Sequence, residues 1–248
     1  MLVNLGGQIL LGGILREPRR EILSRGIHRR QIWLIIYSIV LLTGMLKVYN
    51  RDAVPVFFMA NARKVILIDP GHGGWDPGKI DNAGRLEKDI NLKIATKLQR
   101  DLELGGGVVF TTRLSDVALA DKKRADLNNR KDLAAVTGAD ILISVHQNSY
   151  PSPNARGAQV FYYGDSERSK RLAECIQKRM SETQDISGRA AKPNESYYML
   201  KRTTIPAVIV ECGFMSNASD SAKLAKDEYQ EKVAWSIYLG IIDYYTGT

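Results

Sequence analysis

The sequence lacks internal repeats and low-complexity tracts, which excludes repeat arrays and fibrous proteins. Hydrophobic residues make up 44% of the chain, an ordinary proportion for a globular protein. Its 248 residues are enough for one domain of about 180–200 residues with an appendage. We therefore expect one globular domain and a smaller N-terminal part.

The sequence also lacks a basic stripe interleaved with aromatic side chains, although its formal net charge is +8. Residues 1–51 hold eight Lys and Arg against two Glu, so they carry +6 and the remaining chain carries +2. A nucleic-acid-binding domain would gather its excess positive charge along one face of the fold. The charge distribution therefore argues against a nucleic-acid partner.

Cysteine is scarce, since Cys175 and Cys212 are the two cysteines of the chain. Cys212 has no sign of a basic partner, which favours a buried thiol over a nucleophile. A disulfide between Cys175 and Cys212 is permitted outside the cell, but no feature of the sequence indicates it.

Charge is absent from residues 32–46, which follow a basic segment, residues 1–31. Extended to residues 32–49, this apolar stretch falls at the short end of the roughly 17–25 residues that span a bilayer. We expect it to anchor the protein, with the basic flank cytoplasmic and the rest of the chain on the outer face of the cytoplasmic membrane. A cleavable signal segment is the alternative, because Ala60-Asn61-Ala62 resembles a small-residue cleavage site.

Beyond a linker at residues 50–63, apolar runs alternate with helical periodicity through residues 64–248. Apolar runs predict strands at 64–68, 108–112, 140–146 and 206–211, with a more exposed strand at 158–163. Helices are expected from about residue 86 to the glycines at 105–107, at 127–136, at 166–183 and at the C-terminus. This alternation predicts an α/β fold, a three-layer α/β/α sandwich with a largely parallel central sheet, preceded by the N-terminal membrane-anchor helix.

Groups suited to chemistry follow three of the expected strands. His72 lies in Asp69-Pro70-Gly71-His72-Gly73-Gly74, where glycine lets the backbone pass close to whatever His72 holds. His146 and Glu211 end two further apolar strands, and Glu87 lies in the loop that enters the first helix. Because open α/β sheets bind ligands at the carboxyl ends of their strands, we expect these side chains to share one site.

Two neutral imidazoles and a carboxylate match a catalytic zinc site, which keeps one position open for water. Such a site also needs a carboxylate that is not a ligand, to take the proton of the water and pass it to the leaving amine. Glu87 and Glu211 can divide these two roles, and their spacing does not say which takes which. The plainer alternatives are a helix-start carboxylate for Glu87 and a hydrogen-bonded core histidine for His146.

The chain resembles the type-3 N-acetylmuramoyl-L-alanine amidases over nearly all of residues 64–245. The resemblance is carried by the motif around His72 together with Glu87-Lys88-Asp89, Ser144-Val145-His146-Gln147-Asn148 and Val210-Glu211-Cys212-Gly213. The resemblance implies that His72, Glu87 and His146 hold Zn²⁺ and that Glu211 is the catalytic acid and base. It implies hydrolysis of the amide between the lactyl group of N-acetylmuramic acid and L-alanine in peptidoglycan. Asn148 is expected either to bind substrate or to cap a turn, and Arg113 and Arg130 to be structural.

Three further stretches, residues 157–164, 197–200 and 229–234, resemble the germination-specific amidases of spore formers. That branch implies a role in forming muramic-δ-lactam in the spore cortex. Gln147 and the loop at residues 78–86 depart from the family pattern, which leaves substrate preference open. The alternatives are a general vegetative autolysin, a zinc carboxypeptidase or endopeptidase on stem peptides, and a silent wall-binding regulator. Because no wall-binding repeats are present, targeting is expected from the anchor, the catalytic surface or a protein partner.

Overall fold

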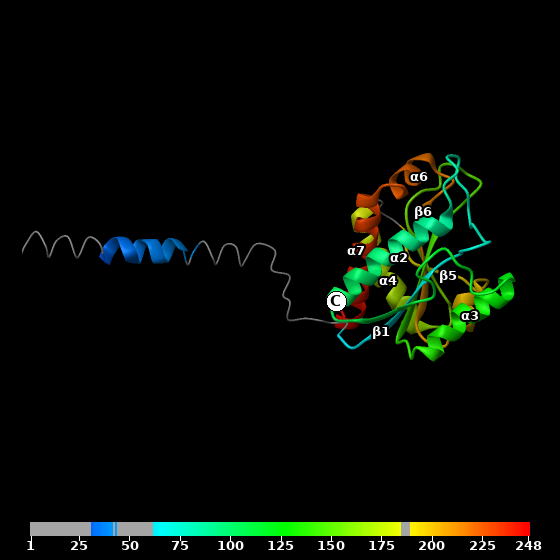
Figure 1. The fold of residues 1–248 in the computed structure, drawn as a ribbon, viewed down its shortest axis with the longest axis horizontal. Helices are drawn as coiled ribbons and strands as arrows, with labels where there is room; N and C mark the ends of the chain where they lie inside the picture. The colour runs from blue at the N-terminus through cyan, green and yellow to red at the C-terminus, as the bar shows by residue number, and fades with distance from the viewer. Residues whose placement is uncertain (1–30, 42, 44–61, 185–188) are drawn as a thin grey trace, which may run out of the picture. The chain divides into compact units, whose positions relative to one another are not determined.

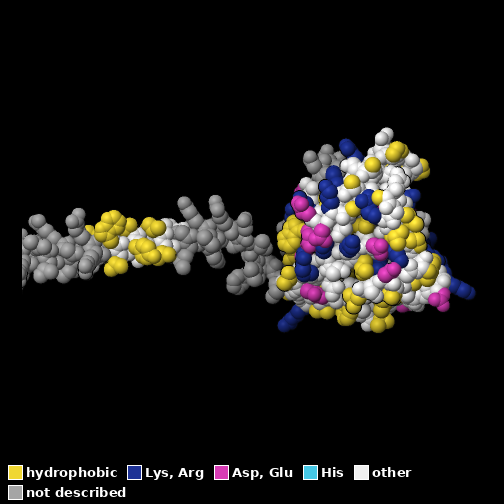
Figure 2. Space-filling view, turned by 45° about the horizontal axis from the view of Figure 1, so that its top comes forward, with side chains coloured by type: hydrophobic (Ala, Val, Ile, Leu, Met, Phe, Trp, Pro, Cys, Tyr) yellow, Lys and Arg dark blue, Asp and Glu magenta, His cyan; other side chains and the backbone are white. Residues whose placement is uncertain are grey.

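The computed structural model describes residues 31–41, 43, 62–184 and 189–248. Residues 31–41 and 43 are helical, and hydrophobic side chains are exposed along this stretch (Figure 2). Ile32 and Trp33 are among them. Among the described residues, no helix is both long enough and apolar enough to cross a membrane. The basic segment up to residue 30, residues 44–49 and most of the linker lie outside the described residues, so the anchor stays a prediction.

The described residues from 62 onward form a mixed α/β fold with a six-stranded sheet (Figure 1). Its elements are, in chain order, β1 (Val65–Pro70), α2 (Glu87–Leu104), β2 (Val108–Thr111), α3 (Lys123–Val136), β3 (Ile141–Asn148), β4 (Gln159–Tyr162), α4 (Glu167–Gln184), β5 (Lys192–Pro193), α5 (Tyr198–Arg202), β6 (Ala207–Phe214), α6 (Ala218–Leu224) and α7 (Asp227–Thr246).

The sheet has the strand order β2-β1-β3-β6-β4-β5. β2, β1, β3 and β6 run parallel to one another. The apolar sequences of β1, β3 and β6 fit strands that are buried on both faces, whereas β2 is a partly exposed edge strand. β4 pairs antiparallel with β6, and β5 runs parallel to β4. The largely parallel sheet expected from the sequence is therefore present, with β4 and β5 reversed.

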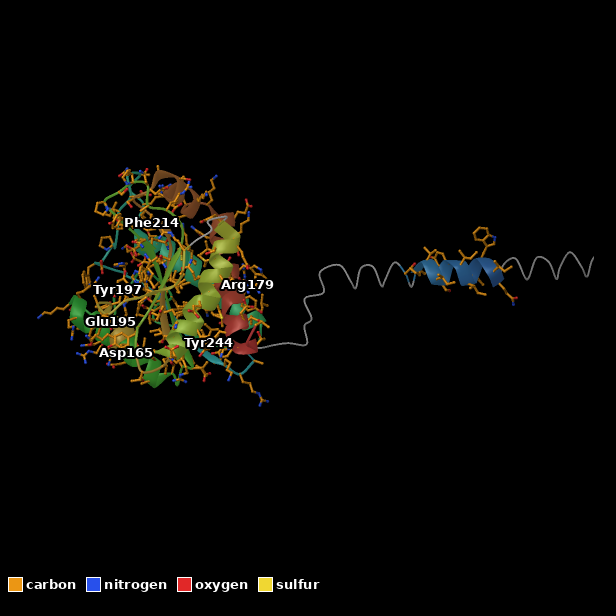
Figure 3. The ribbon with its side chains drawn as sticks, turned by 180° about the vertical axis from the view of Figure 1, so that it is seen from behind. Asp165, Arg179, Glu195, Tyr197, Phe214 and Tyr244 are labelled. Carbon is orange, nitrogen blue, oxygen red and sulfur yellow. The ribbon has the colours of Figure 1, made fainter. Side chains whose placement is uncertain are left out.

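Helices cover both faces of the sheet, as a three-layer arrangement requires. α2, α4 and α7 pack together on one face, around a core that includes Leu98, Ile176 and Ile237. α3 and α5 contact the strands on the other face, where Leu142 and Met199 belong to a second buried cluster. Figure 3 marks Arg179 of α4 and Tyr244 of α7, whose two helices pack side by side.

Two expectations about individual elements were wrong. β4 is not the more exposed strand that its alternation suggested, because α4 packs against it and Val160 has 0% exposure. α3 begins at Lys123 rather than at Leu127. The sequence did not indicate this start because Lys123 and Arg124 are cations, which are unfavourable in the first turn of a helix.

The strand order places a topological switch point at β1. The chain passes from β1 to β2 on one side, while β3 pairs with the other side of β1. Ligands bind outside the carboxyl ends of strands at such a point, because the connections diverge there and leave a crevice. His72 follows β1 directly, and His146 lies near the end of β3.

Candidate metal centre and active site

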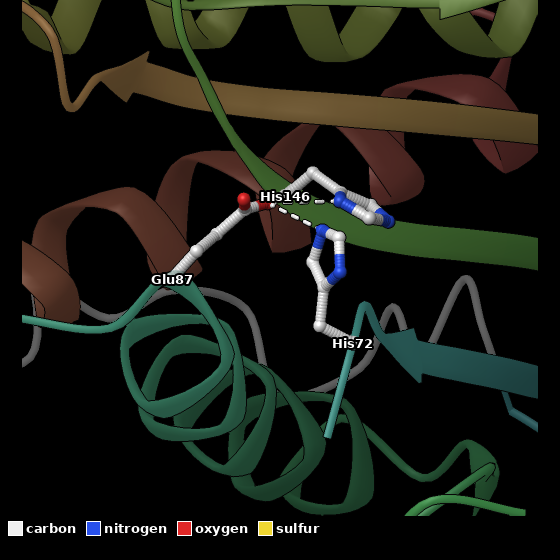
Figure 4. A group of neighbouring side chains, drawn as sticks. All are labelled: His72, Glu87 and His146. Carbon is white, nitrogen blue, oxygen red and sulfur yellow. Dashed lines mark hydrogen bonds and ion pairs between the residues drawn. The ribbon is translucent and has the colours of Figure 1, made fainter. Parts of the chain in front are cut away.

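His72, Glu87 and His146 come together at the carboxyl end of the sheet (Figure 4). The Glu87 Oε1 atom lies 3.2 Å from His72 Nε2 and 3.0 Å from His146 Nδ1. Glu87 is 4% exposed, and its carboxylate also accepts hydrogen bonds from the backbone N–H groups of Lys79 and Gln147. Burial acts to raise the pKa of Glu87, but the hydrogen bonds from His146 and His72 outweigh it and hold that pKa well below its usual range.

The three side chains fit a zinc ion by donor type and by spacing. Two imidazole nitrogens and one carboxylate oxygen are zinc ligands, and their candidate ligand atoms all lie within 4.8 Å of one another. Ligand atoms at about 2.0–2.1 Å from a tetrahedral zinc lie about 3.3 Å apart. The separations at Glu87 Oε1 are close to that value, so little movement is needed to hold the ion.

The His72 loop adopts a conformation that few residues other than glycine tolerate. His72 has φ 63°, in the left-handed region, where such strain is typical of functional sites. Its Nδ1 atom lies 2.9 Å from Asp76 Oδ2, which leaves Nε2 directed at Glu87. The Lys123 ammonium pairs with the same Asp76 oxygen. A carboxylate on the second ring nitrogen fixes the tautomer and orientation of a metal-binding histidine.

Two buried arginines hold the strand end that carries His72. Arg130 donates hydrogen bonds to the carbonyls of Pro70 and His72, and its Nη1 lies 2.8 Å from Asp69 Oδ1. Arg113 donates to the carbonyls of Pro70 and Gly71. Both guanidiniums therefore have the structural role that the sequence favoured, although most of their partners are backbone oxygens.

Glycine is required at two positions around the cluster. A Cβ on Gly71 would lie 2.1 Å from Nε2 of His146. A Cβ on Gly78, which has φ +65°, would lie 2.6 Å from the Glu87 Oε2 atom. The backbone thus approaches the imidazole and the carboxylate more closely than any side chain would allow.

Glu211 lies on β6 directly opposite His146 on β3, so both side chains reach the same crevice. Glu211 is 5% exposed, and its Oε2 atom accepts no hydrogen bond from any described residue. The Tyr197 hydroxyl donates to Oε1 at 3.3 Å, and the Tyr197 ring, labelled in Figure 3, packs edge-on against Phe161. Burial, with the Glu87 charge beside it, raises the pKa of Glu211 to about 7.

One cavity of about 370 Å³ joins these groups. Its lining includes the three candidate ligands, Glu211 and Asn148, together with Lys123, Leu127, Tyr197 and Tyr198. The Asn148 Oδ1 atom accepts the N–H of the next residue, Ser149, and Asn148 also borders the cavity. Substrate binding by Asn148 stays a prediction.

Cys212 is not among the residues that line the cavity. It is fully buried, its burial raises the pKa of the thiol, and it is not joined to Cys175 by a disulfide. Sequence reasoning missed Asp76, Lys123 and Tyr197. Asp76 had one usable signal, because Asp76-Pro77-Gly78 repeats the Asp69-Pro70-Gly71 pattern. Tyr197 lies in residues 197–200, which the resemblance marked without a role for the side chain. Lys123 had no signal, since its contact depends on how α3 packs.

The site combines two imidazoles and a carboxylate with a second buried carboxylate in the same cavity. This combination is typical of a metal-dependent hydrolase. The Amidase_3 family, described as N-acetylmuramoyl-L-alanine amidase, matches residues 66–243. The chain is 35% identical over 222 residues to the germination-specific N-acetylmuramoyl-L-alanine amidase of Bacillus subtilis, covering 86% of this chain and 93% of that protein. The chain therefore belongs to the Amidase_3 family, and it is an N-acetylmuramoyl-L-alanine amidase that acts on peptidoglycan.

Solved structures agree with this assignment. The CwlD amidase of Clostridioides difficile, in complex with the GerS lipoprotein, matches with a TM-score of 0.71 at 38% identity, over 75% of this chain and 100% of that one. The catalytic domain of the amidase CwlV from Bacillus (Paenibacillus) polymyxa var. colistinus matches with a TM-score of 0.66 at 31% identity, over 73% and 97%. The family resemblance drawn from the sequence motifs is confirmed.

Proposed function

We propose that the protein is a zinc-dependent amidase that hydrolyses the amide joining the lactyl group of N-acetylmuramic acid to L-alanine. The observation that carries the proposal is Glu211, which borders the same cavity as the His72, Glu87 and His146 cluster. This buried carboxyl has a raised pKa, and its Oε2 atom accepts no hydrogen bond from the described residues. A general base beside a metal-binding cluster is the combination that amide hydrolysis by activated water requires.

Each side chain has a defined task in this reaction. His72, Glu87 and His146 hold the ion, which when bound polarises the amide carbonyl and lowers the pKa of water. Glu211 takes the proton of the attacking water and then donates it to the nitrogen of the leaving L-alanine. Tyr197 orients the Glu211 carboxyl through its hydroxyl, and the apolar surroundings of Glu211 keep its pKa near neutrality, where a group can both accept and donate a proton.

Two substitutions test this division of roles. His72→Ala should lose zinc and activity together, because a shell of three protein ligands then lacks one of them. Glu211→Gln should keep one zinc per chain and lose activity by about 10²–10⁴-fold, the usual contribution of a general acid and base. Full activity of Glu211→Gln, or stoichiometric zinc in an active His72→Ala variant, would contradict the assignment.

We further propose that the amidase acts on the spore cortex, where removal of stem peptides precedes formation of muramic-δ-lactam. The support is the 35% identity to a germination-specific amidase over most of both chains. Spores of a deletion strain should lack muramic-δ-lactam and germinate poorly, as measured by mass spectrometry of cortex muropeptides. Normal lactam content with a defect in separating vegetative cells would instead identify a general autolysin.

The proposed location is the outer face of the cytoplasmic membrane, with residues 32–49 as the anchor. Peptidoglycan lies outside that membrane, and a basic flank precedes the apolar stretch. A lipoprotein partner is proposed by analogy with the Clostridioides difficile CwlD complex with GerS. Protease added to intact protoplasts should digest the catalytic domain, and full protection of that domain would contradict the proposed location.

A further inference from the structure

The first turn of α3 carries a charge pattern that helix stability does not explain. The helix starts with three consecutive exposed cations, Lys122, Lys123 and Arg124. The N-terminal end of a helix carries partial positive charge, so cations there are unfavourable by a few tenths of a kcal/mol or more. Lys123 is compensated by Asp76, whereas no residue in the described ranges forms an ion pair with Arg124. The positive charge of Arg124 is therefore unfavourable for the helix and is not offset there.

Arg124 is ordered without being neutralised. The guanidinium carbon lies 4.1 Å from the centroid of the Tyr198 ring, and the Tyr198 hydroxyl bonds to Asn128 one turn along α3. Within the part of the chain that the structure describes, Arg124 forms no ion pair and donates no hydrogen bond. Stacking fixes the plane of a guanidinium while leaving its N–H donors available for a planar anion.

This guanidinium adjoins the active-site cavity. Tyr198, on which it stacks, lines the cavity, as does Lys123 next to it in sequence. Tyr197, the residue before Tyr198, donates its hydroxyl to Glu211. The side of the cavity formed by α3 and α5 therefore carries the positive charge of Arg124, and Glu87 and Glu211 line the same cavity.

We propose that Arg124, supported by Tyr198, binds a free carboxylate of the stem peptide and so orients the substrate across the cavity. This inference rests on the proposed function. In an uncleaved muropeptide the lactyl carboxyl is tied up in the scissile amide, so the free carboxylates belong to the peptide. Arg124 attracts such a carboxylate to the α3–α5 side of the cavity, which sets one direction of binding. The peptide then lies on the α3–α5 side, and the glycan lies on the other.

The test compares two substrates that differ in charge. One is a disaccharide tetrapeptide muropeptide, and the other is the same muropeptide with its carboxylates converted to carboxamides. Wild-type zinc-loaded protein should show a KM about tenfold lower for the acid form, with similar kcat. Arg124→Gln should raise the KM for the acid form about tenfold and leave the KM for the amidated form unchanged. Arg124→Lys, which keeps the charge but loses the planar stack, should give an intermediate KM.

The matched control is Arg168→Gln, because Arg168 is an exposed arginine on α4, across the sheet from α3. It should leave both KM values unchanged. An unchanged KM of Arg124→Gln for the acid form, or an equal rise for both substrates, would overturn the proposal, since the equal rise reports a disturbed cavity wall. If wild-type protein cleaves neither substrate at the lactyl amide, the result contradicts the proposed amidase function. If it cleaves both but Arg124→Gln does not change the KM for the acid form, the result contradicts only the role of Arg124.

Discussion

Replacing Asp69 by Asn should destabilise the fold far more than its single lost charge would at the surface. Asp69 is 1% exposed at the end of β1 and accepts hydrogen bonds from Thr112 and Ser144 at 2.7 Å. Its ion pair with Arg130 is equally buried. Removing one member of a buried pair leaves an uncompensated charge, which typically costs about 3–5 kcal/mol.

The pKa of Asp69 supports a similar magnitude. Burial acts to raise this pKa, but Arg130 and the two hydroxyl donors lower it from 3.8 to about 2. A shift of that size corresponds to about 2–3 kcal/mol of stabilisation of the charged form. Because Arg130 keeps its Asp126 partner in the variant, we expect Asp69→Asn to lose about 2–3 kcal/mol at pH 7.

Urea unfolding as a function of pH measures this contribution. The folded pKa of Asp69 is lower than the unfolded value, so its stabilisation is complete above about pH 4 and is lost as the pH falls toward 2. The difference between wild type and Asp69→Asn should therefore narrow over that interval. Asp132→Asn, which removes an exposed partner of Lys131, should cost under about 0.5 kcal/mol. A loss below about 0.5 kcal/mol for Asp69→Asn, or a pH-independent difference, would refute the reasoning.

Three further predictions concern the site. Asp76→Ala should weaken zinc binding about 10–100-fold in chelator competition, because His72 loses the carboxylate that orients its ring, and unchanged affinity would contradict that role. Tyr197→Phe removes a hydrogen bond that lowers the pKa of Glu211, so the acid limb of the kcat/KM profile should move to higher pH, and a shift to lower pH would be inconsistent. Gly71→Ala should abolish zinc binding, since its Cβ would displace the His146 imidazole, and a fully loaded variant would show that the loop can yield.

The positions of the principal site residues could be predicted because each follows an apolar strand or opens a helix. A carboxylate such as Glu211 after three buried aliphatic residues is costly unless it has a function, and that cost is visible in the sequence. The parallel sheet then brings the strand ends together, which is how His146 and Glu211 become neighbours. The ordering of roles between Glu87 and Glu211 was not predictable from spacing, since both are carboxylates near the same crevice.

Contacts between distant elements could not be predicted. Lys123 reaches Asp76 because the first turn of α3 lies beside the loop that follows β1, and Arg124 stacks on Tyr198 because the same turn meets α5. The same limitation explains β4, whose alternation suggested an exposed face before the packing of α4 was known. Periodicity reports which residues are apolar, and it does not report which helix covers them.

The measurement that tests the central claim most directly is the mass of the products from purified cortex muropeptides. Zinc-loaded protein should release intact stem peptides with a new amino group on L-alanine and leave the glycan with free lactyl carboxylates. Zinc-loaded Glu211→Gln should leave the same muropeptides uncut. Cleavage within the stem peptide, or equal yields of the lactyl cleavage products from both proteins, would contradict the assignment of this cavity as a zinc amidase site with Glu211 as its acid and base.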